Sequence, residues 1–183
     1  MSFGQLGAVI IRENVSSGDG SLEIMIPGHR ISVIFMVARI NYYCELIDAL
    51  KLSSIDFLNK IINILHKCAD EWDGQANRNE NDRYLITWRL PETDGTTDNE
   101  KNEALMEQKT ELADKSLISA VKIVSEMRRA QEFTPYYMRP ALKGRFNNAM
   151  RPDLTFGLHM GWTIEGAIGS EAKIDACYLS PQC

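Results

Sequence analysis

The chain has 183 residues, of which 44% are hydrophobic and 25% charged, and its formal net charge is −5 at neutral pH. These values suit one soluble globular domain and exclude collagen-like, coiled-coil and wholly disordered chains. The acidic balance argues against nucleic acid as a partner, and no apolar run approaches the roughly 20 residues of a membrane helix. We therefore expect no membrane insertion and no signal peptide, and a location inside the cell, in the cytoplasm or on the cytoskeleton.

The first predicted strand follows a mixed lead-in, residues 1–30, in which residues 3–14 could form a short helix. Residues 31–38 are a dense apolar run rich in β-branched side chains. Such a run predicts a strand buried on both faces, and therefore a sheet covered by helices. Residues 53–72 then carry apolar side chains at three- and four-residue spacing, which predicts an amphipathic helix with Ser53 or Ser54 as its N-cap.

A hairpin and a second helix are expected next. Residues 83–88 have the composition of a strand, and the polar stretch before them places a hairpin turn near Asn81 and Asp82. The polar tract 91–103 predicts a loop. The helix after it should end at Arg128 and Arg129, where cations suit the helix dipole. Its predicted core positions are Leu112, Leu117, Ile118, Val121, Ile123, Val124 and Met127.

The last third of the chain predicts irregular structure and then strands. Residues 134–153 contain three prolines and are expected to be irregular. Residues 154–162 alternate between apolar and polar, which predicts a strand, and residues 164–169 and 173–178 predict a strand pair. The order strand, helix, hairpin, helix, strand, strand favours the α+β class, with a mixed sheet and helices packed on one face. We expect all three tryptophans, Trp72, Trp88 and Trp162, in the core.

Neither the cysteines nor the histidines form a recognisable metal motif. The four cysteines lack the spacing of a zinc knuckle and the three histidines are scattered, so we expect free thiols in a reducing compartment. The chain also lacks a Gly-rich phosphate loop, since it contains neither GxxxxGK[ST] nor GxGxxG after a strand. The cysteines are Cys44, Cys68, Cys177 and Cys183.

Three segments, residues 35–42, 77–85 and 158–181, carry small clusters of polar groups at strand edges or in the hairpin. The third begins Leu-His-Met-Gly-Trp-Thr-Ile-Glu-Gly-Ala-Ile-Gly-Ser and ends in Tyr-Leu-Ser-Pro. Because of these three segments, the chain resembles the catalytic domain of class III adenylate and guanylate cyclases. The resemblance extends from about Phe3 onward. The resemblance implies a ferredoxin-like βαββαβ palm, and a dimer with the nucleotide site at its interface. It also implies cyclisation of ATP or GTP to a cyclic nucleotide and pyrophosphate.

The resemblance also implies which residues would hold the metals. In the family two aspartates bridge two divalent cations, because Mg²⁺ and Mn²⁺ prefer oxygen ligands. The hairpin aspartate corresponds to Asp82, and the residue before it is Asn81 where the family has glycine. The other aspartate falls at Val37, and a valine side chain ligates no metal.

The remaining family positions are also altered. The purine-recognition lysine falls at Arg78, which keeps the charge but changes its shape, and the partner aspartate corresponds to Asp175. The asparagine and arginine that stabilise the transition state are expected beyond Pro181, and the sequence ends at Cys183. Residues 1–183 are therefore interpreted as a single divergent, C-terminally truncated cyclase-homology domain.

These departures favour an inactive domain that serves as a structural or regulatory partner of another cyclase-like chain or of a large assembly, with no cofactor. A working cyclase using Mg²⁺ or Mn²⁺ with ATP or GTP is the alternative, and a nucleotide-binding sensor without catalysis lies between them. The sensor would use Asp82, Arg78 and Asp175. Each of the three also has a purely structural interpretation: a turn residue, a solvated hairpin charge, and an exposed pair with Lys173, respectively.

Overall fold

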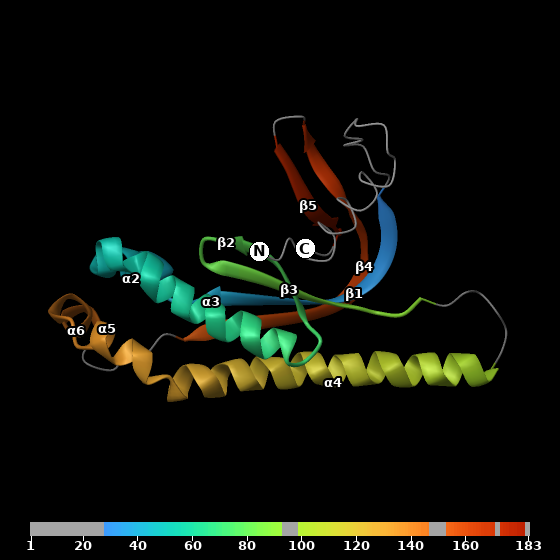
Figure 1. Cartoon of the computed structure of the whole chain (residues 1–183), viewed down its shortest axis with the longest axis horizontal. Helices are drawn as coiled ribbons and strands as arrows, with labels where there is room; N and C mark the ends of the chain where they lie inside the picture. Colours follow the sequence, from blue (N-terminus) through green and yellow to red (C-terminus); the bar gives the residue numbers. More distant parts are fainter. Residues whose placement is uncertain (1–27, 93–98, 147–152, 171–172, 182–183) are drawn as a thin grey trace, which may run out of the picture.

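Five strands form one sheet in the order β2-β3-β1-β4-β5 in the computed structural model, which describes residues 28–92, 99–146, 153–170 and 173–181 (Figure 1). The order β2-β3-β1-β4, with helices after β1 and after β3, is the ferredoxin-like βαββαβ arrangement predicted from the sequence. The strands are β1 (His29–Ile40), β2 (Gln75–Glu80), β3 (Arg83–Arg89), β4 (Leu154–Ser170) and β5 (Lys173–Leu179).

Every neighbouring pair of strands is antiparallel, so the expected mixed sheet is corrected to an antiparallel one. The physical reason is the place of β3, which lies between β1 and β2. These two strands are joined by a helical crossover and run the same way, but they never pair with each other.

Helices cover one face of this sheet (Figure 1). Lys115 of α4 joins Asp73, just after α3, at 2.6 Å, so these two helices lie side by side. No helix in the described ranges is long and apolar enough to cross a bilayer. The helices are α2 (Tyr43–Leu50), η1 (Lys51–Ser53), α3 (Ser54–Asp70), α4 (Asn99–Arg129), η2 (Gln131–Phe133), α5 (Thr134–Tyr137) and α6 (Pro140–Phe146).

Four local predictions are corrected. Residues 154–162 and 164–169, predicted as two strands, form the single strand β4 (Leu154–Ser170). Helix α4 begins at Asn99, so residues 99–103 of the expected loop 91–103 are helical, because Glu and Lys are good helix formers without any apolar pattern. Residues 134–146, expected to be irregular, form α5 and α6, whose prolines stand in the first turn, where the missing N–H needs no partner. Ser53 precedes α3 but makes no capping hydrogen bond with its side chain.

The main core lies between the helices and one face of the sheet. It combines alternate residues of β1 with one stripe of α3 and one of α4, as the periodicities of strand and helix require. Trp88 on β3 is fully buried there, whereas Trp72 is half-buried and Trp162 is exposed, so only one tryptophan meets the prediction. The central members are Ile34, Met36, Ala38, Ile40, Phe57, Ile61, Leu65, Trp88, Ala120, Ile123 and Met127.

The buried stripe of α4 is narrower than the sequence predicts. Ile123 is fully buried, but Val121 is 63% exposed, and Leu117 and Ile118 are exposed as well. The stripe instead includes small residues, Ser116 and Ser119 among them, which let α4 approach α3 and the sheet closely. Apolar character alone therefore misassigns one flank of the helix to the core.

The sheet covers its own second face at one end. Ile31, Val33 and Phe35 are buried there beneath Leu85 and Tyr178, and the rings of Phe35 and Tyr178 meet edge to face at 6.1 Å. Figure 1 shows the β4–β5 hairpin bending away from the plane of the other strands. The burial of β1 on both faces is thus confirmed for this part, but the curl of the sheet produces it and not a second layer of helices.

His66 on α3 should make stability depend on pH. Its Nε2 atom is buried and has no hydrogen-bond partner among the described residues, and burial lowers the pKa of its imidazole despite a hydrogen bond with Asn79. A lowered pKa in the fold means that the unfolded chain takes up the proton first. Stability should therefore fall as the pH drops below about 6.5, the ordinary value for histidine.

Urea unfolding at pH 7.5 and pH 5.5 would measure this. We expect the midpoint to drop at the lower pH and His66→Gln to remove part of that drop. The control is His29→Gln, at an exposed residue of β1, which should show the same decrease of the urea midpoint as the wild type. An equal drop in the wild type and His66→Gln would contradict the assignment.

Candidate functional site

The candidate site lies where the second face of the sheet is open. Beyond Met36, side chains on this face of β1 are no longer covered, and Val37 and Arg39 are exposed. The β2–β3 hairpin turn reaches the same place, because the N–H of Ile40 donates to the carbonyl of Asp82 at 2.8 Å. The end of β1 and the hairpin turn therefore meet, and these are the two segments to which the resemblance assigns the metal positions.

Asn81 keeps the turn in the form that a glycine would give. Its φ is 49°, in the left-handed region, which asparagine tolerates better than most residues with a side chain. Strands β2 and β3 are joined directly through Asn81 and Asp82, as predicted. Asparagine therefore provides, at this turn position, the left-handed backbone conformation that a glycine would also adopt.

The carboxylate of Asp82 is bound to arginine. The Nε of Arg39 donates to its Oδ2 at 2.7 Å, and the Nε of Arg83 lies 3.9 Å from its Oδ1. The hydrogen bond from Arg39 is the main reason that the pKa of Asp82 is lowered. Asp82 is thus an ionised carboxylate whose charge is balanced within the chain.

A divalent cation does not fit these residues. Val37, at the position that the resemblance assigns to the second ligand, faces the same side of β1 as Arg39. It is 38% exposed, and its side chain has no donor atom. Nowhere in the described ranges do three His, Cys, Asp or Glu residues gather in a way that could hold a metal ion. A divalent cation needs several oxygen ligands, and the one carboxylate here is already paired with a guanidinium.

The two positions that the resemblance assigns to purine recognition lie on opposite edges of the sheet. Arg78 is on β2, next to a register shift, and its Nη2 pairs with Oε1 of Glu80 at 2.7 Å, with both side chains about half exposed. Asp175 is on β5, opposite Ile168 of β4. The structure therefore brings Asp82 together with Arg39 and Arg83, and places Arg78 and Asp175 on strands at the two ends of the order.

A cavity of about 770 Å³ opens beside Asp82. Arg39 and Asp82 form one side of it and the start of α2 forms another, where Tyr42 has a φ of 57° and gives the helix no side-chain cap. Arg39 is not among the site residues predicted from the sequence. The alternation of a strand could have indicated it, because Arg39 lies two residues after Val37 and therefore on the same face. The lining residues are Arg39, Ile40, Asn41, Tyr42, Tyr43, Cys44, Glu45, Asn81, Asp82 and Asp153.

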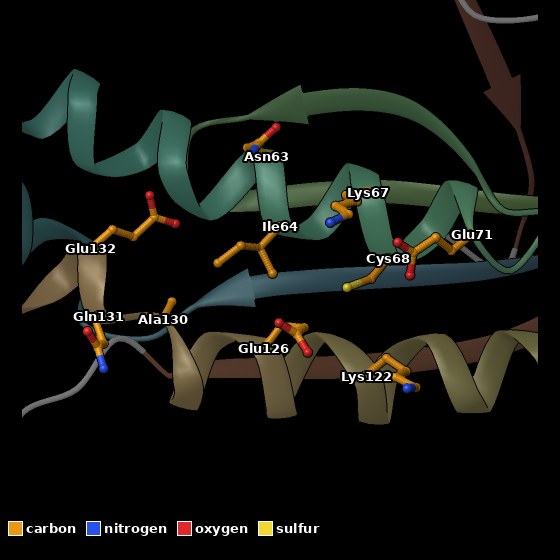
Figure 2. A pocket seen from close by; sticks show the side chains of 10 residues that line it. All are labelled: Asn63, Ile64, Lys67, Cys68, Glu71, Lys122, Glu126, Ala130, Gln131 and Glu132. Carbon is orange, nitrogen blue, oxygen red and sulfur yellow. The ribbon is translucent and has the colours of Figure 1, made fainter.

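A second cavity, of about 480 Å³, lies between α3 and the end of α4 (Figure 2). Its walls carry charges of both signs, with Lys67 from α3 and Glu71 just after it facing Lys122 and Glu126 from α4. Burial raises the pKa of the Cys68 thiol on its wall, so this cysteine stays protonated and unreactive. The arrangement offers no nucleophile and no single-sign charge for an ionic ligand.

The prediction of free thiols is confirmed where the structure describes it. Cys44, Cys68 and Cys177 are free, and Cys183 lies outside the described residues, as does the expected helix at residues 3–14. These cysteines supply no covalent cross-link to the fold.

Comparison with solved structures finds this fold in nucleotidyl cyclases. A bacterial light-regulated adenylyl cyclase superposes with a TM-score of 0.60 and 17% identity, over 84% of this chain and 65% of that one. The adenylyl cyclase CyaB from P. aeruginosa gives 0.58 and 15%, over 85% and 69%. The dimeric guanylyl cyclase domain of the RhoGC fusion protein from the aquatic fungus Blastocladiella emersonii gives 0.57 and 16%, over 85% and 71%.

The chain thus spans just under two thirds of the first of these proteins. At 15–17% sequence identity, the similarity shows the fold alone. No protein-family model matches the sequence, and no curated protein does. The ferredoxin-like antiparallel sheet with helices on one face is therefore the fold of class III cyclase catalytic domains.

Proposed function

We propose that this chain is a non-catalytic nucleotidyl cyclase-like domain, which serves as a structural or regulatory subunit beside another cyclase-like chain or within a larger assembly. The observation that carries the proposal is the pairing of Asp82 with Arg39 at 2.7 Å, next to a valine at the other ligand position. The fold supports the cyclase-like part, and the altered ligand set supports the loss of turnover.

The chemistry explains why these changes matter. Cyclisation requires attack of the ribose 3′-hydroxyl on the α-phosphate, with pyrophosphate as the leaving group, and bound divalent cations would supply activation of the hydroxyl and neutralisation of the developing charge. When bound, the metals would supply that charge stabilisation, but this chain offers them one carboxylate. Loss of one such stabilising group typically lowers turnover by about two to three orders of magnitude.

A direct assay tests the proposal. The purified chain is incubated with ATP or GTP and Mg²⁺ or Mn²⁺, alone and with any cyclase chain that co-purifies from the native source. We expect no cyclic nucleotide above the enzyme-free blank from this chain alone. When it is combined with the co-purifying chain, the rate of cyclic nucleotide formation should be the same for the wild type and for Asp82→Asn.

A cyclic product that is lost in Asp82→Asn would overturn the proposal and establish the working cyclase instead. The matched control is Asp114→Asn, which removes an exposed carboxylate from α4. Thermal stabilisation by ATP or GTP without any product would point to the non-catalytic nucleotide sensor.

A further inference from the structure

Asp82 lies between two arginines that the sheet itself places side by side. Arg39 of β1 and Arg83 of β3 are directly opposite each other in the antiparallel register. Like charges in this position repel each other, so the pair is unfavourable unless an anion lies between them. Asp82 supplies that anion, with Oδ2 facing Arg39 and Oδ1 facing Arg83.

This arrangement uses both oxygens of the carboxylate. Oδ2 accepts the 2.7 Å hydrogen bond from Arg39, and Oδ1 has the guanidinium of Arg83 at 3.9 Å. A metal ion bound to either oxygen would stand within a few ångströms of two guanidinium groups, which carry their charge at every physiological pH. Asp82 is the carboxylate that both guanidinium groups approach, and their two positive charges exceed its single negative charge. Glu45 and Asp153 also line the cavity, but among the described residues they do not form with Asp82 a group that could hold a metal ion.

We infer that the guanidinium of Arg39 takes the place of a divalent cation at Asp82, so that the chain carries its own cation at the position where the fold family holds a metal. The missing carboxylate at Val37 and the presence of Arg39 are then two independent obstacles to metal binding. The inference rests on the proposed function in treating the site as free of metal, but it concerns cation binding and not turnover.

Two obstacles predict a definite pattern of Mn²⁺ binding among variants. Val37→Asp alone should still fail, because Arg39 remains on Asp82. Arg39→Ala alone should fail, because one carboxylate does not hold the ion. Val37→Asp/Arg39→Ala should bind Mn²⁺ with a dissociation constant on the order of 10⁻⁴–10⁻³ M, as weakly as the weakest oxygen-ligand Ca²⁺ sites of proteins.

Electron paramagnetic resonance of free Mn²⁺, or calorimetry, measures this binding without any nucleotide. Val37→Asp/Arg78→Ala is the matched control, because it makes the same change in charge but removes an arginine that pairs with Glu80. It should not bind. Adding Asp82→Asn to the binding variant should abolish its affinity. Arg39 pairs with Asp82 at the surface, where such pairs contribute little to stability, so its removal should leave the fold intact by circular dichroism.

Two results would overturn the inference. Mn²⁺ binding by Val37→Asp as tight as that of the double variant would mean that Arg39 is no obstacle. A folded double variant that binds no Mn²⁺ would mean that Val37 and Asp82 do not flank a cation position. Neither result would show turnover by the wild-type chain, so the proposed function is tested separately, by the cyclic-nucleotide assay.

Discussion

Replacing Trp88 with alanine should lower the free energy of unfolding by about 3–5 kcal/mol, the usual cost of truncating a large buried aromatic side chain. Trp88 has no exposed surface, and its Nε1 donates to the carbonyl of Trp72 at 2.8 Å. Its ring also packs against Gly74, where an added Cβ would lie 2.6 Å from the ring. The substitution would therefore leave a cavity and remove the hydrogen bond that ties the turn after α3 to the sheet.

Chemical denaturation of the purified chain measures this loss, and Trp162→Ala is the matched control. Trp162 lies on β4, is 36% exposed, and has the guanidinium of Arg30 over its ring. We expect less than half the destabilisation seen at Trp88. Equal losses at the two sites would show that the sheet does not bury Trp88 selectively.

Replacing Ile123 with alanine should cost about 2–5 kcal/mol, whereas Val121→Ala should change stability by less than about 0.5 kcal/mol. Both residues lie on α4 and both were expected in the core from the sequence. In the structure Ile123 is fully buried and Val121 is 63% exposed, because they lie on opposite sides of the helix. The pair therefore tests which flank of α4 is docked on the sheet.

The same denaturation experiment, with both variants compared at one temperature, decides between the two assignments. A larger loss at Val121 than at Ile123 would mean that α4 is rotated about its axis from the position described. Circular dichroism should show unchanged helix content in both variants, since alanine is the best helix former.

Much of the fold could be predicted because its signals are local. The apolar run of β1 and the three- and four-residue spacing of α3 each report a period that belongs to one element. The hairpin turn at Asn81 and Asp82 is likewise visible from residue type. Helix α2 was missed because eight residues are too few to show a period, and the start of α4 was missed because its first turns are polar throughout.

The candidate site could be predicted only in part. That Val37 cannot ligate a metal follows from the amino acid itself, and so does the ability of Asp82 to do so. What Asp82 binds depends on Arg39, which is 43 residues away along the chain. That contact follows from the antiparallel register of β1 with β3, which residue spacing does not report.

The sequence by itself thus determined the kinds and order of the main elements and the chemistry that each site residue can offer. The tertiary structure decided which flank of α4 is buried, which tryptophan is in the core, and that Asp82 faces arginines. The reason is physical. Periodicity is a property of one segment, whereas burial and ion pairing depend on which distant segments the sheet register and the curl of the sheet bring together.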